Sequence, residues 1–227
     1  MATHGKKYRK VSAKTEDRVY AVSEAIGFLK ANKIAKFDET AELAIRLGVD
    51  TKKTDQTVRG TVALPHGTGK TVRVAVFAAG AAADAARAAG AEFVGNDDLI
   101  EKVKGGWVDF DIAIATPDAM KEVRKLGKVL GPRGLMPNPK TGTVTDDTAS
   151  AVRDSKAGRV EYRMDRNGNV QVPFGKLSFD ESKLIDNVNA VIAAVAAARP
   201  AAAKGIFIKR CTLSSTMGVG LRVDVRS

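Results

Sequence analysis

The middle of the chain alternates short apolar runs with segments of helical pattern, and no other feature restricts the fold as strongly. The predicted elements are strands at 72–77, 91–94 and 110–115 and helices at 81–89, 97–104 and 119–126. Strands that alternate with helices are typical of a parallel sheet with helices on both faces. The sequence therefore predicts a Rossmann-like α/β unit in the middle of the chain.

The two ends of the chain follow a different pattern. Apolar periodicity predicts helices at 15–31 and 182–199 and strands at 41–47, 56–64, 206–213 and 219–225. Asn167-Gly168 lies between two further apolar runs, 159–164 and 170–174, and predicts a β-hairpin. Hairpins combined with helices indicate an α+β unit.

Charge also separates the ends from the middle. The 227 residues include 37 Lys+Arg and 26 Asp+Glu, a net charge of +11. Residues 1–67 and 159–227 each carry +5, whereas 68–158 carry +1. The expected fold class is α/β with two domains: a discontinuous α+β domain formed by 1–67 and 159–227, and an inserted Rossmann-like three-layer α/β domain formed by 68–158. A small domain this basic is typical of a polyanion binder, although charge that only aids solubility is the alternative.

Composition excludes several kinds of chemistry. One Cys and two His leave too few ligands for a zinc site and too few partners for a disulfide framework or a Ser-His-Asp triad. The most apolar stretch, 188–198, is shorter than the roughly 20 residues of a membrane span, and no apolar segment follows the basic N-terminus. We expect a soluble cytoplasmic protein that is not an enzyme, holds no cofactor or metal and binds no membrane.

Gly67-Thr68-Gly69-Lys70-Thr71 is similar to a phosphate-binding P-loop, but two features contradict that interpretation. The P-loop pattern requires Gly where Leu64 stands, and a strand follows the segment where the pattern requires a helix. The sequence predicts a Gly-rich linker between domains. We expect hinge motion at Gly67, Gly69 and Gly158.

Several carboxylates and a long loop in the middle of the chain are weaker indications of a functional site. Asp109 and Asp111 alternate on a predicted strand, as an acid/base pair would, and Asp97 and Asp98 fit the start of a helix. The loop at 131–143 is rich in Gly, Pro and cations, a composition that suits contact with phosphate or with another domain.

Several residues at the chain ends suit contact with nucleic acid. The N-terminal arm, 1–14, is basic and is expected to lack regular structure until it meets phosphate. Phe37 follows Lys36, and an aromatic beside a cation can stack on a base. The segment 214–218 joins small hydroxyl side chains to Gly218, so it can bond phosphates and 2′-hydroxyls at close approach.

Four motifs together resemble the ribosomal protein L1 family. They are Phe37-Asp38-Glu39-Thr40, the stretch from Val58-Arg59-Gly60 to Gly67-Thr68-Gly69-Lys70, Gly131-Pro132-Arg133-Gly134-Leu135-Met136-Pro137, and Thr216-Met217-Gly218. The resemblance covers essentially the whole chain, and the Gly131–Pro137 motif is its most specific part.

The resemblance implies a split first domain with a Rossmann-like insertion, as the charge partition also indicates. It implies a structural constituent of the large ribosomal subunit that binds the stalk region of large-subunit rRNA. It also implies contact with exit-site tRNA, a part in the release of deacylated tRNA, and repression of translation by binding the protein's own operon mRNA. The protein is expected to be ribosome-associated and to be a monomer when free.

The resemblance also implies an RNA site made of the motif residues. The family's contact on the strand leading into Thr216-Met217-Gly218 falls on Arg210, and Ser214 joins the site as a small hydroxyl on the same segment. The expected members of the site are Lys36, Phe37, Thr40, Arg210, Ser214, Thr216, Met217 and Gly218. Supporting basic contacts are expected from Lys6, Lys7, Arg9, Lys10 and Arg163. Two alternatives stay open, a nucleotide-using enzyme on the Rossmann-like insertion and a general DNA-binding protein, and they differ in their binding of ATP and of duplex DNA.

Overall fold

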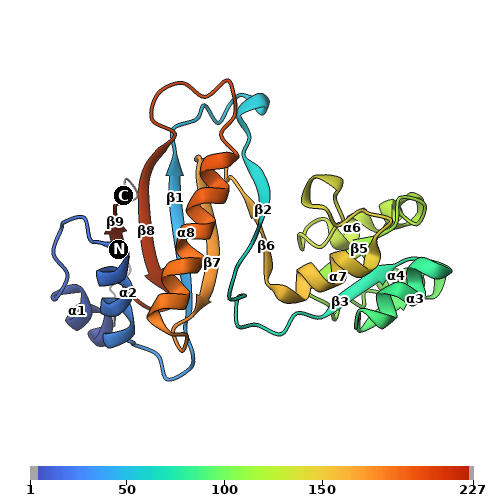
Figure 1. Ribbon diagram of the computed structural model, residues 1–227, viewed down its shortest axis with the longest axis horizontal. Helices are drawn as coiled ribbons and strands as arrows, with labels where there is room; N and C mark the ends of the chain where they lie inside the picture. The colour runs from blue at the N-terminus through green and yellow to red at the C-terminus, as the bar shows by residue number, and fades with distance from the viewer. Residues whose placement is uncertain (1–4, 225–227) are drawn as a thin grey trace. The chain divides into compact units, whose positions relative to one another are not determined.

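The computed structural model describes residues 5–224 of a mixed α/β chain with three sheets (Figure 1). Contacts divide the chain into two compact units. The terminal unit comprises Met1–Gly69 and Val160–Ser227, and the central unit comprises Lys70–Arg159. Each unit has its own buried apolar residues.

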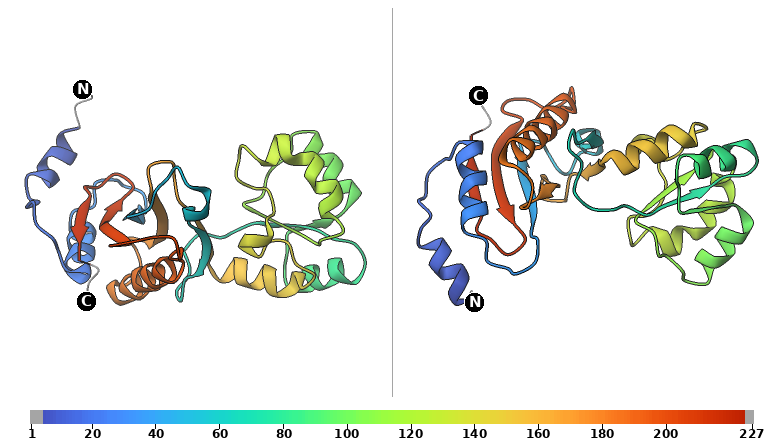
Figure 2. Two further views of the ribbon diagram at one scale, coloured as in Figure 1. Left: turned by 90° about the horizontal axis from the view of Figure 1, so that it is seen from above. Right: turned by 60° about the horizontal axis from the view of Figure 1, so that its bottom comes forward.

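A four-stranded sheet organises the terminal unit. Its order is β7 (Asn169–Lys176), β1 (Thr40–Leu47), β8 (Ile208–Ser215) and β9 (Leu221–Val223), and each neighbouring pair is antiparallel. Helices α2 (Val22–Ala31) and α8 (Glu181–Ala197) cover one face, as both views in Figure 2 show. The opposite face carries polar side chains and is open, which is the usual arrangement of an antiparallel sheet with one buried face.

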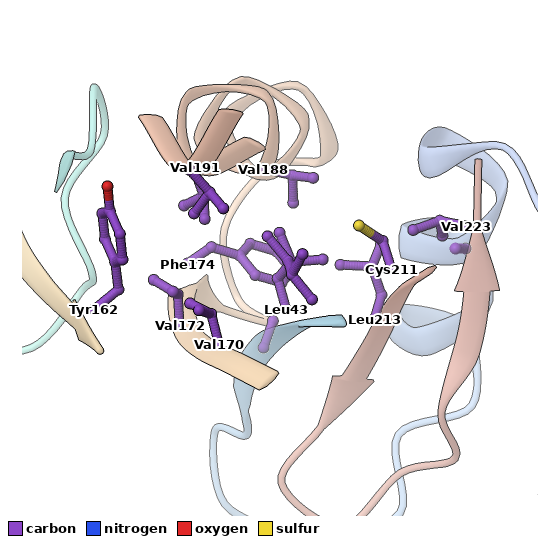
Figure 3. Packing of buried hydrophobic residues seen from close by; sticks show 14 of the residues in the cluster. Leu43, Tyr162, Val170, Val172, Phe174, Val188, Val191, Cys211, Leu213 and Val223 are labelled. Atoms are coloured by element: carbon purple, nitrogen blue, oxygen red, sulfur yellow. The ribbon is translucent and has the colours of Figure 1, made fainter. Parts of the chain in front are cut away.

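The core of this unit lies between α8 and the sheet. Val188 and Val191 of α8 point toward Leu43, Phe174 and Leu213 on three neighbouring strands (Figure 3). All five side chains are fully buried. The predicted period-two pattern of 41–47 is confirmed, since Ala41, Leu43, Ile45 and Leu47 are the buried residues of β1.

The predicted hairpin around Asn167-Gly168 is wrong. A turn does form there, because the Gly168 N–H donates to Asp165 O at 3.1 Å and Gly168 has φ +79°. However, β6 (Arg159–Arg163) pairs with β2 (Arg59–Ala63) in a two-stranded sheet, whereas β7 pairs with β1. Long-range pairing with the apolar strand β1 outweighs the local turn signal.

The central unit contains a parallel sheet, as predicted. Its order is β4 (Phe93–Gly95), β3 (Val74–Phe77) and β5 (Ile112–Ala115). On one face, Val74 and Val76 pack with α3 (Ala81–Ala88) and α7 (Thr148–Ala157). On the other face, Ala75 and Phe77 pack with α4 (Asp97–Lys104), α5 (Met120–Val123) and α6 (Gly127–Leu130). Helix α7 has no counterpart among the predicted elements.

Several predicted elements differ from the structure at the N-terminal end. Residues expected to be irregular form α1 (Lys6–Ser12), and its Tyr8 and Val11 pack against the core. The helix expected at 15–31 begins only at Val22, because the preceding segment runs beside β9, where the Tyr20 N–H donates to Arg222 O at 2.8 Å.

Other boundaries shift for local reasons. The strand expected from 56 begins at Arg59, after the 3₁₀ turn η1 (Thr54–Gln56). The helix expected at 119–126 is divided into α5, η2 (Arg124–Leu126) and α6, and η3 (Pro139–Thr141) follows. The strand expected at 219–225 ends at Val223, and its last residue lies outside the described residues. None of the helices within 5–224 has the length and apolar character needed to cross a membrane.

Candidate nucleic-acid interface

The antiparallel register of β1 and β8 brings two distant motifs together at one end of the sheet. The start of β1 lies beside the end of β8, where Ala41 pairs with Ser215. The Thr216 N–H donates to Thr40 O, and the Thr40 N–H donates to Thr216 Oγ1, both at 3.0 Å. We call residues 34–40 and 215–218 the Phe37 end of the sheet, which lies at the bottom of the terminal unit in Figure 1.

Two large apolar side chains are exposed at the Phe37 end. Phe37 is 54 % exposed and Met217 is 53 % exposed. Both belong to segments that hydrogen bonds tie to the sheet. Lys36 beside Phe37 is also exposed. An exposed aromatic next to a cation can stack on a base while the cation contacts phosphate.

A lysine at the end of β7, Lys176, holds the Thr40 side chain by a hydrogen bond. The Lys176 ammonium donates to Thr40 Oγ1 at 2.8 Å and to Asp38 O at 3.4 Å. The Ser178 hydroxyl donates to Asp38 Oδ2 at 2.8 Å, so the segment before β1 is fixed on this side as well. A hydroxyl that accepts from Lys176 still has its own proton to donate, which suits a phosphate or 2′-oxygen acceptor.

Three members of the segment 214–218 have roles inside the protein. The Thr216 hydroxyl accepts from Thr40 N and donates to Thr40 O at 3.3 Å, so it fastens the turn to β1. Ser215 is buried and donates to Glu39. A Cβ on Gly218 would lie 2.3 Å from Ser215 Oγ, so Gly218 is required by internal packing. Ser214 keeps the expected position on the open face, opposite Glu42 of β1.

Glu39 belongs to the Phe37–Thr40 motif but is not among the expected site residues, and the structure places it at the Phe37 end. Its carboxylate is fully buried beneath the Phe37 end. Burial alone would raise the pKa of this carboxyl, but four hydrogen bonds from the side chain of Ser215 and three backbone N–H groups hold the pKa below its usual value. The period-two pattern contained the signal, since continuing the inward positions 41, 43, 45 and 47 backwards places residue 39 on the buried face.

Arg210 lies on the open face but away from the Phe37 end. It pairs with Arg46 across β1 and β8. Arg210 and Thr216 are six positions apart in the chain, which corresponds to about 20 Å along an extended strand. The structure therefore does not bring Arg210 together with Phe37 and Met217.

Arg210 belongs instead to a cluster of exposed cations at the other end of the sheet. The turn at 165–168 and the segment before β8 meet the end of β1 here, because the Leu47 N–H donates to Gly168 O at 2.8 Å and the Gly48 N–H donates to Phe207 O at 2.6 Å. The exposed cations are Arg46, Lys52, Lys53, Arg166, Lys204, Lys209 and Arg210, against the three carboxylates Asp50, Asp55 and Asp165. We call this group the cationic end of the sheet.

The supporting cations lie on other elements. Lys6, Lys7, Arg9 and Lys10 are exposed along α1, and Arg163 is exposed at the end of β6, outside the four-stranded sheet. The structure therefore does not bring these cations together with the Phe37 end in one sheet.

The three expected hinge glycines adopt left-handed backbone conformations with local explanations. Gly158 ends α7 at φ +108°. Gly67 has φ +65°, and its carbonyl accepts from buried Asn187 at 3.0 Å. Gly69 has φ +72°, and a Cβ there would lie 2.9 Å from the Phe179 ring. The conformations require Gly, and hinge motion at these positions stays a prediction.

The P-loop-like segment does not precede a helix, because the chain enters β3 at Val74. Lys70 donates to Asp111 Oδ1 at 2.6 Å, and Arg73 bonds both Asp109 and Asp111. The Lys70 hydrogen bond is the largest cause that lowers the pKa of Asp111 to about 2. Both carboxylates are therefore engaged in ion pairs rather than poised for acid/base chemistry.

The loop at 131–143 and the carboxylates Asp97 and Asp98, which the sequence also singled out, have structural roles in the central unit. Leu135 and Met136 of the loop at 131–143 pack against the core, and the Asn138 N–H donates to Thr143 Oγ1 at 2.8 Å. Asp97 and Asp98 occupy the first turn of α4, after Asn96 at the N-cap position, whose side chain makes no capping hydrogen bond. No cluster of three metal-ligating side chains occurs within residues 5–224.

An open sheet face bordered by cations, with an exposed aromatic at one end, is the arrangement of a nucleic-acid-binding protein. Residues 29–219 match the model of the ribosomal protein L1p/L10e family. The match spans most of the chain, and the chain belongs to this family. The family comprises structural, RNA-binding proteins of the large ribosomal subunit rather than enzymes, and it implies a ribosome-associated, cytoplasmic location.

Proposed function

We propose that the protein binds the stalk region of large-subunit rRNA through the Phe37 end of its terminal unit. The observation that carries the proposal is the exposure of Phe37 and Met217 on two segments fixed to each other by the paired Thr40 and Thr216. A fixed pair of exposed apolar side chains suits the shape of a folded RNA with unstacked bases, whereas it offers little to a regular duplex.

The site would combine specific and general contacts. Phe37, Met217, Thr40 and Ser214 would meet bases, sugars and phosphates directly, with Lys36 beside them. Thr216 and Gly218 would act by shaping the turn that carries Met217. The cations of α1, with Arg163, would add affinity that does not depend on sequence and decreases with salt.

The cationic end supports a second RNA contact. Seven exposed cations surround an end of the sheet about one strand length from the Phe37 end. We propose that this surface meets the departing tRNA at the exit site, because phosphate contacts that ignore sequence suit a partner that changes with every codon.

Repression of the protein's own operon mRNA would use the Phe37 end again. An mRNA that presents the same fold as the rRNA stalk would compete for the same side chains. Stalk RNA should then displace the mRNA, and variants at Phe37 should weaken both interactions together.

We further propose that the two compact units are separate domains and that the free protein is a monomer. The division at Gly69/Lys70 and Arg159/Val160 lies within two residues of the boundaries 67/68 and 158/159 that separate the basic ends from the nearly neutral middle. Hinge motion at Gly67, Gly69 and Gly158 would let the central domain move while the terminal domain holds RNA. Cross-linking the domains through engineered cysteines should change RNA binding or stalk motion, and no change in either would contradict the hinge.

A competition assay tests the main proposal. The ligand is a stalk RNA fragment, the competitor is duplex DNA, and salt is varied. Tight RNA binding that survives DNA competition supports the proposal. Full competition by DNA would instead indicate a general DNA-binding protein, and saturable binding of ATP would favour a nucleotide-using enzyme on the central unit.

A further inference from the structure

The buried carboxylate of Glu39 joins the two segments that carry the exposed apolar side chains. Oε1 accepts from the Ile34 and Ala35 N–H groups at 3.1 and 2.7 Å. Oε2 accepts from Ser215 Oγ at 2.6 Å and from the Met217 N–H at 3.3 Å. One side chain therefore bonds the loop before Phe37 with one oxygen and the turn that carries Met217 with the other.

The backbone of Glu39 adds a third connection. Its carbonyl accepts from the Leu177 N–H at 2.9 Å, directly after β7. Glu39 thus contacts the neighbours of β1 on both sides, at the point where the sheet ends. Other bonds help to hold these segments, namely those between Thr216 and Thr40 and those from Lys176 and Ser178 to Asp38. Among the contacts described for residues 5–224, however, only the Glu39 side chain bonds both the loop before Phe37 and the Met217 N–H.

The carboxylate is held by hydrogen bonds rather than by a cation. Among residues 5–224, no Lys, Arg or His forms an ion pair with Glu39. Hydrogen bonds to an ionised acceptor are roughly twice as strong as neutral ones, and an unsatisfied buried charge is costly. In the conformation that exposes Phe37 and Met217, all four donors bond this carboxylate, so a change in either segment would leave part of the buried charge unsatisfied.

We propose that Glu39 is a positioning residue for RNA recognition: without touching RNA, its carboxylate fixes the loop of Phe37 and the turn of Met217 in the conformation that binds. The proposal rests on the proposed function. It differs from a purely structural role because it predicts a loss of RNA affinity in protein that is still folded.

The test substitution is Glu39→Gln, which keeps the volume but removes the charge and two acceptor sites. An amide nitrogen is a donor, so it would face either the Ile34 and Ala35 N–H groups or the donors of Ser215 and Met217. Ser215→Ala is a milder second variant, since it removes only the hydrogen bond from the hydroxyl. Tyr162→Phe is the control, because it removes a buried hydrogen bond to Ala194 O elsewhere in the same unit.

The full-length variants are compared for binding of a stalk RNA fragment and of duplex DNA, with thermal unfolding to establish that each is folded. We expect Glu39→Gln to weaken RNA binding at least tenfold, Ser215→Ala to weaken it less, and Tyr162→Phe to leave it within twofold. DNA binding should stay within twofold in all three. Amide exchange at Ala35 and Met217 should accelerate in Glu39→Gln and stay unchanged in Tyr162→Phe.

A double-mutant cycle separates positioning from general stabilisation. If Glu39 acts through Met217, the loss from Glu39→Gln should be much smaller in a Met217→Ala background than in the wild type. Folded Glu39→Gln protein that binds stalk RNA within twofold of the wild type, or fully additive losses, would overturn the proposal. Failure of the proposed function looks different, because combined Phe37→Ala and Met217→Ala would then leave RNA binding unchanged whatever Glu39→Gln does.

Discussion

The Phe37 end and the cationic end lie at opposite ends of the same four-stranded sheet, but their side chains differ in kind. The Phe37 end exposes two apolar side chains above a buried carboxylate and an internal hydrogen-bond network. The cationic end exposes seven cations on loops and strand ends, together with the apolar side chain of Ile206. Under the proposed function, the Phe37 end would supply specificity, which needs fixed shape, and the cationic end would supply general affinity, which needs charge.

The largest effect is expected from removing the apolar pair. Combined Phe37→Ala and Met217→Ala should weaken stalk RNA binding by roughly 1–3 kcal/mol, because stacking and close apolar contact are lost. Binding of duplex DNA should not change, since the cations are intact. Equilibrium binding of both ligands at one salt concentration measures this, and an equal loss for both would remove the distinction between the ends.

Gly218→Ala should damage the Phe37 end without removing any contact group. The new Cβ would lie 2.3 Å from Ser215 Oγ, so the hydroxyl that donates to Glu39 must move. We expect a loss of about 1–3 kcal/mol in the free energy of unfolding, together with weaker RNA binding. Gly127→Ala is the control, because the new Cβ would have no atom within 4 Å apart from its chain neighbours and its own helix backbone. Equal stability of the two variants in denaturant unfolding would contradict the packing argument.

Neutralising the cationic end should have a smaller effect that depends on salt. In Lys52→Gln, Lys53→Gln and Arg166→Gln, each lost phosphate contact should reduce the slope of log K against log salt by about 0.7–0.9. Affinity for tRNA should decrease, while the preference for stalk RNA over duplex DNA should be kept. A change in that preference would show that the cationic end also contributes specificity.

Acid should affect the Phe37 end through Glu39. The pKa of Glu39 in the folded protein lies below its usual 4.5, so the carboxylate stabilises the fold above that pH and the stabilisation is lost as pH falls through the folded pKa. Wild type and Glu39→Gln should therefore differ in stability at neutral pH and converge in acid. Amide shifts of Ala35 and Met217 should follow this titration, whereas the amide of Val191, buried in α8, should not. A Val191 amide that moves with the same titration would indicate general acid unfolding.

The sequence predicted the local patterns better than it predicted their pairing. The parallel sheet of the central unit and the alternation of β1 follow from apolar period, which is a local signal. The partner of β7 could not be predicted, because Asn167-Gly168 forms a turn whichever strands it joins. Helix α7 carries few large apolar residues and gave no clear pattern.

For the candidate site too, the sequence indicated individual residues but not the long-range contacts between them. Phe37 and Met217 were found from their motifs, and the structure places both in exposed positions on bonded segments. The internal roles of Thr216 and Ser215 depend on contacts with residues 176 positions away in the chain, which sequence alone does not reveal. Gly218 depends on the same contact, because its close neighbour is the Ser215 hydroxyl that donates to Glu39. Arg210 could be assigned to an end of the sheet only once its register with Arg46 was known.

Amide hydrogen exchange of the full-length protein, measured with and without a stalk RNA fragment, tests the division between the two ends most directly. We expect strong protection on RNA binding at 34–40 and 215–218 that persists in high salt. Protection at 48–53 and 165–168 should be weak and should disappear as salt increases. Strong, salt-resistant protection at the cationic end, with none at the Phe37 end, would contradict the account.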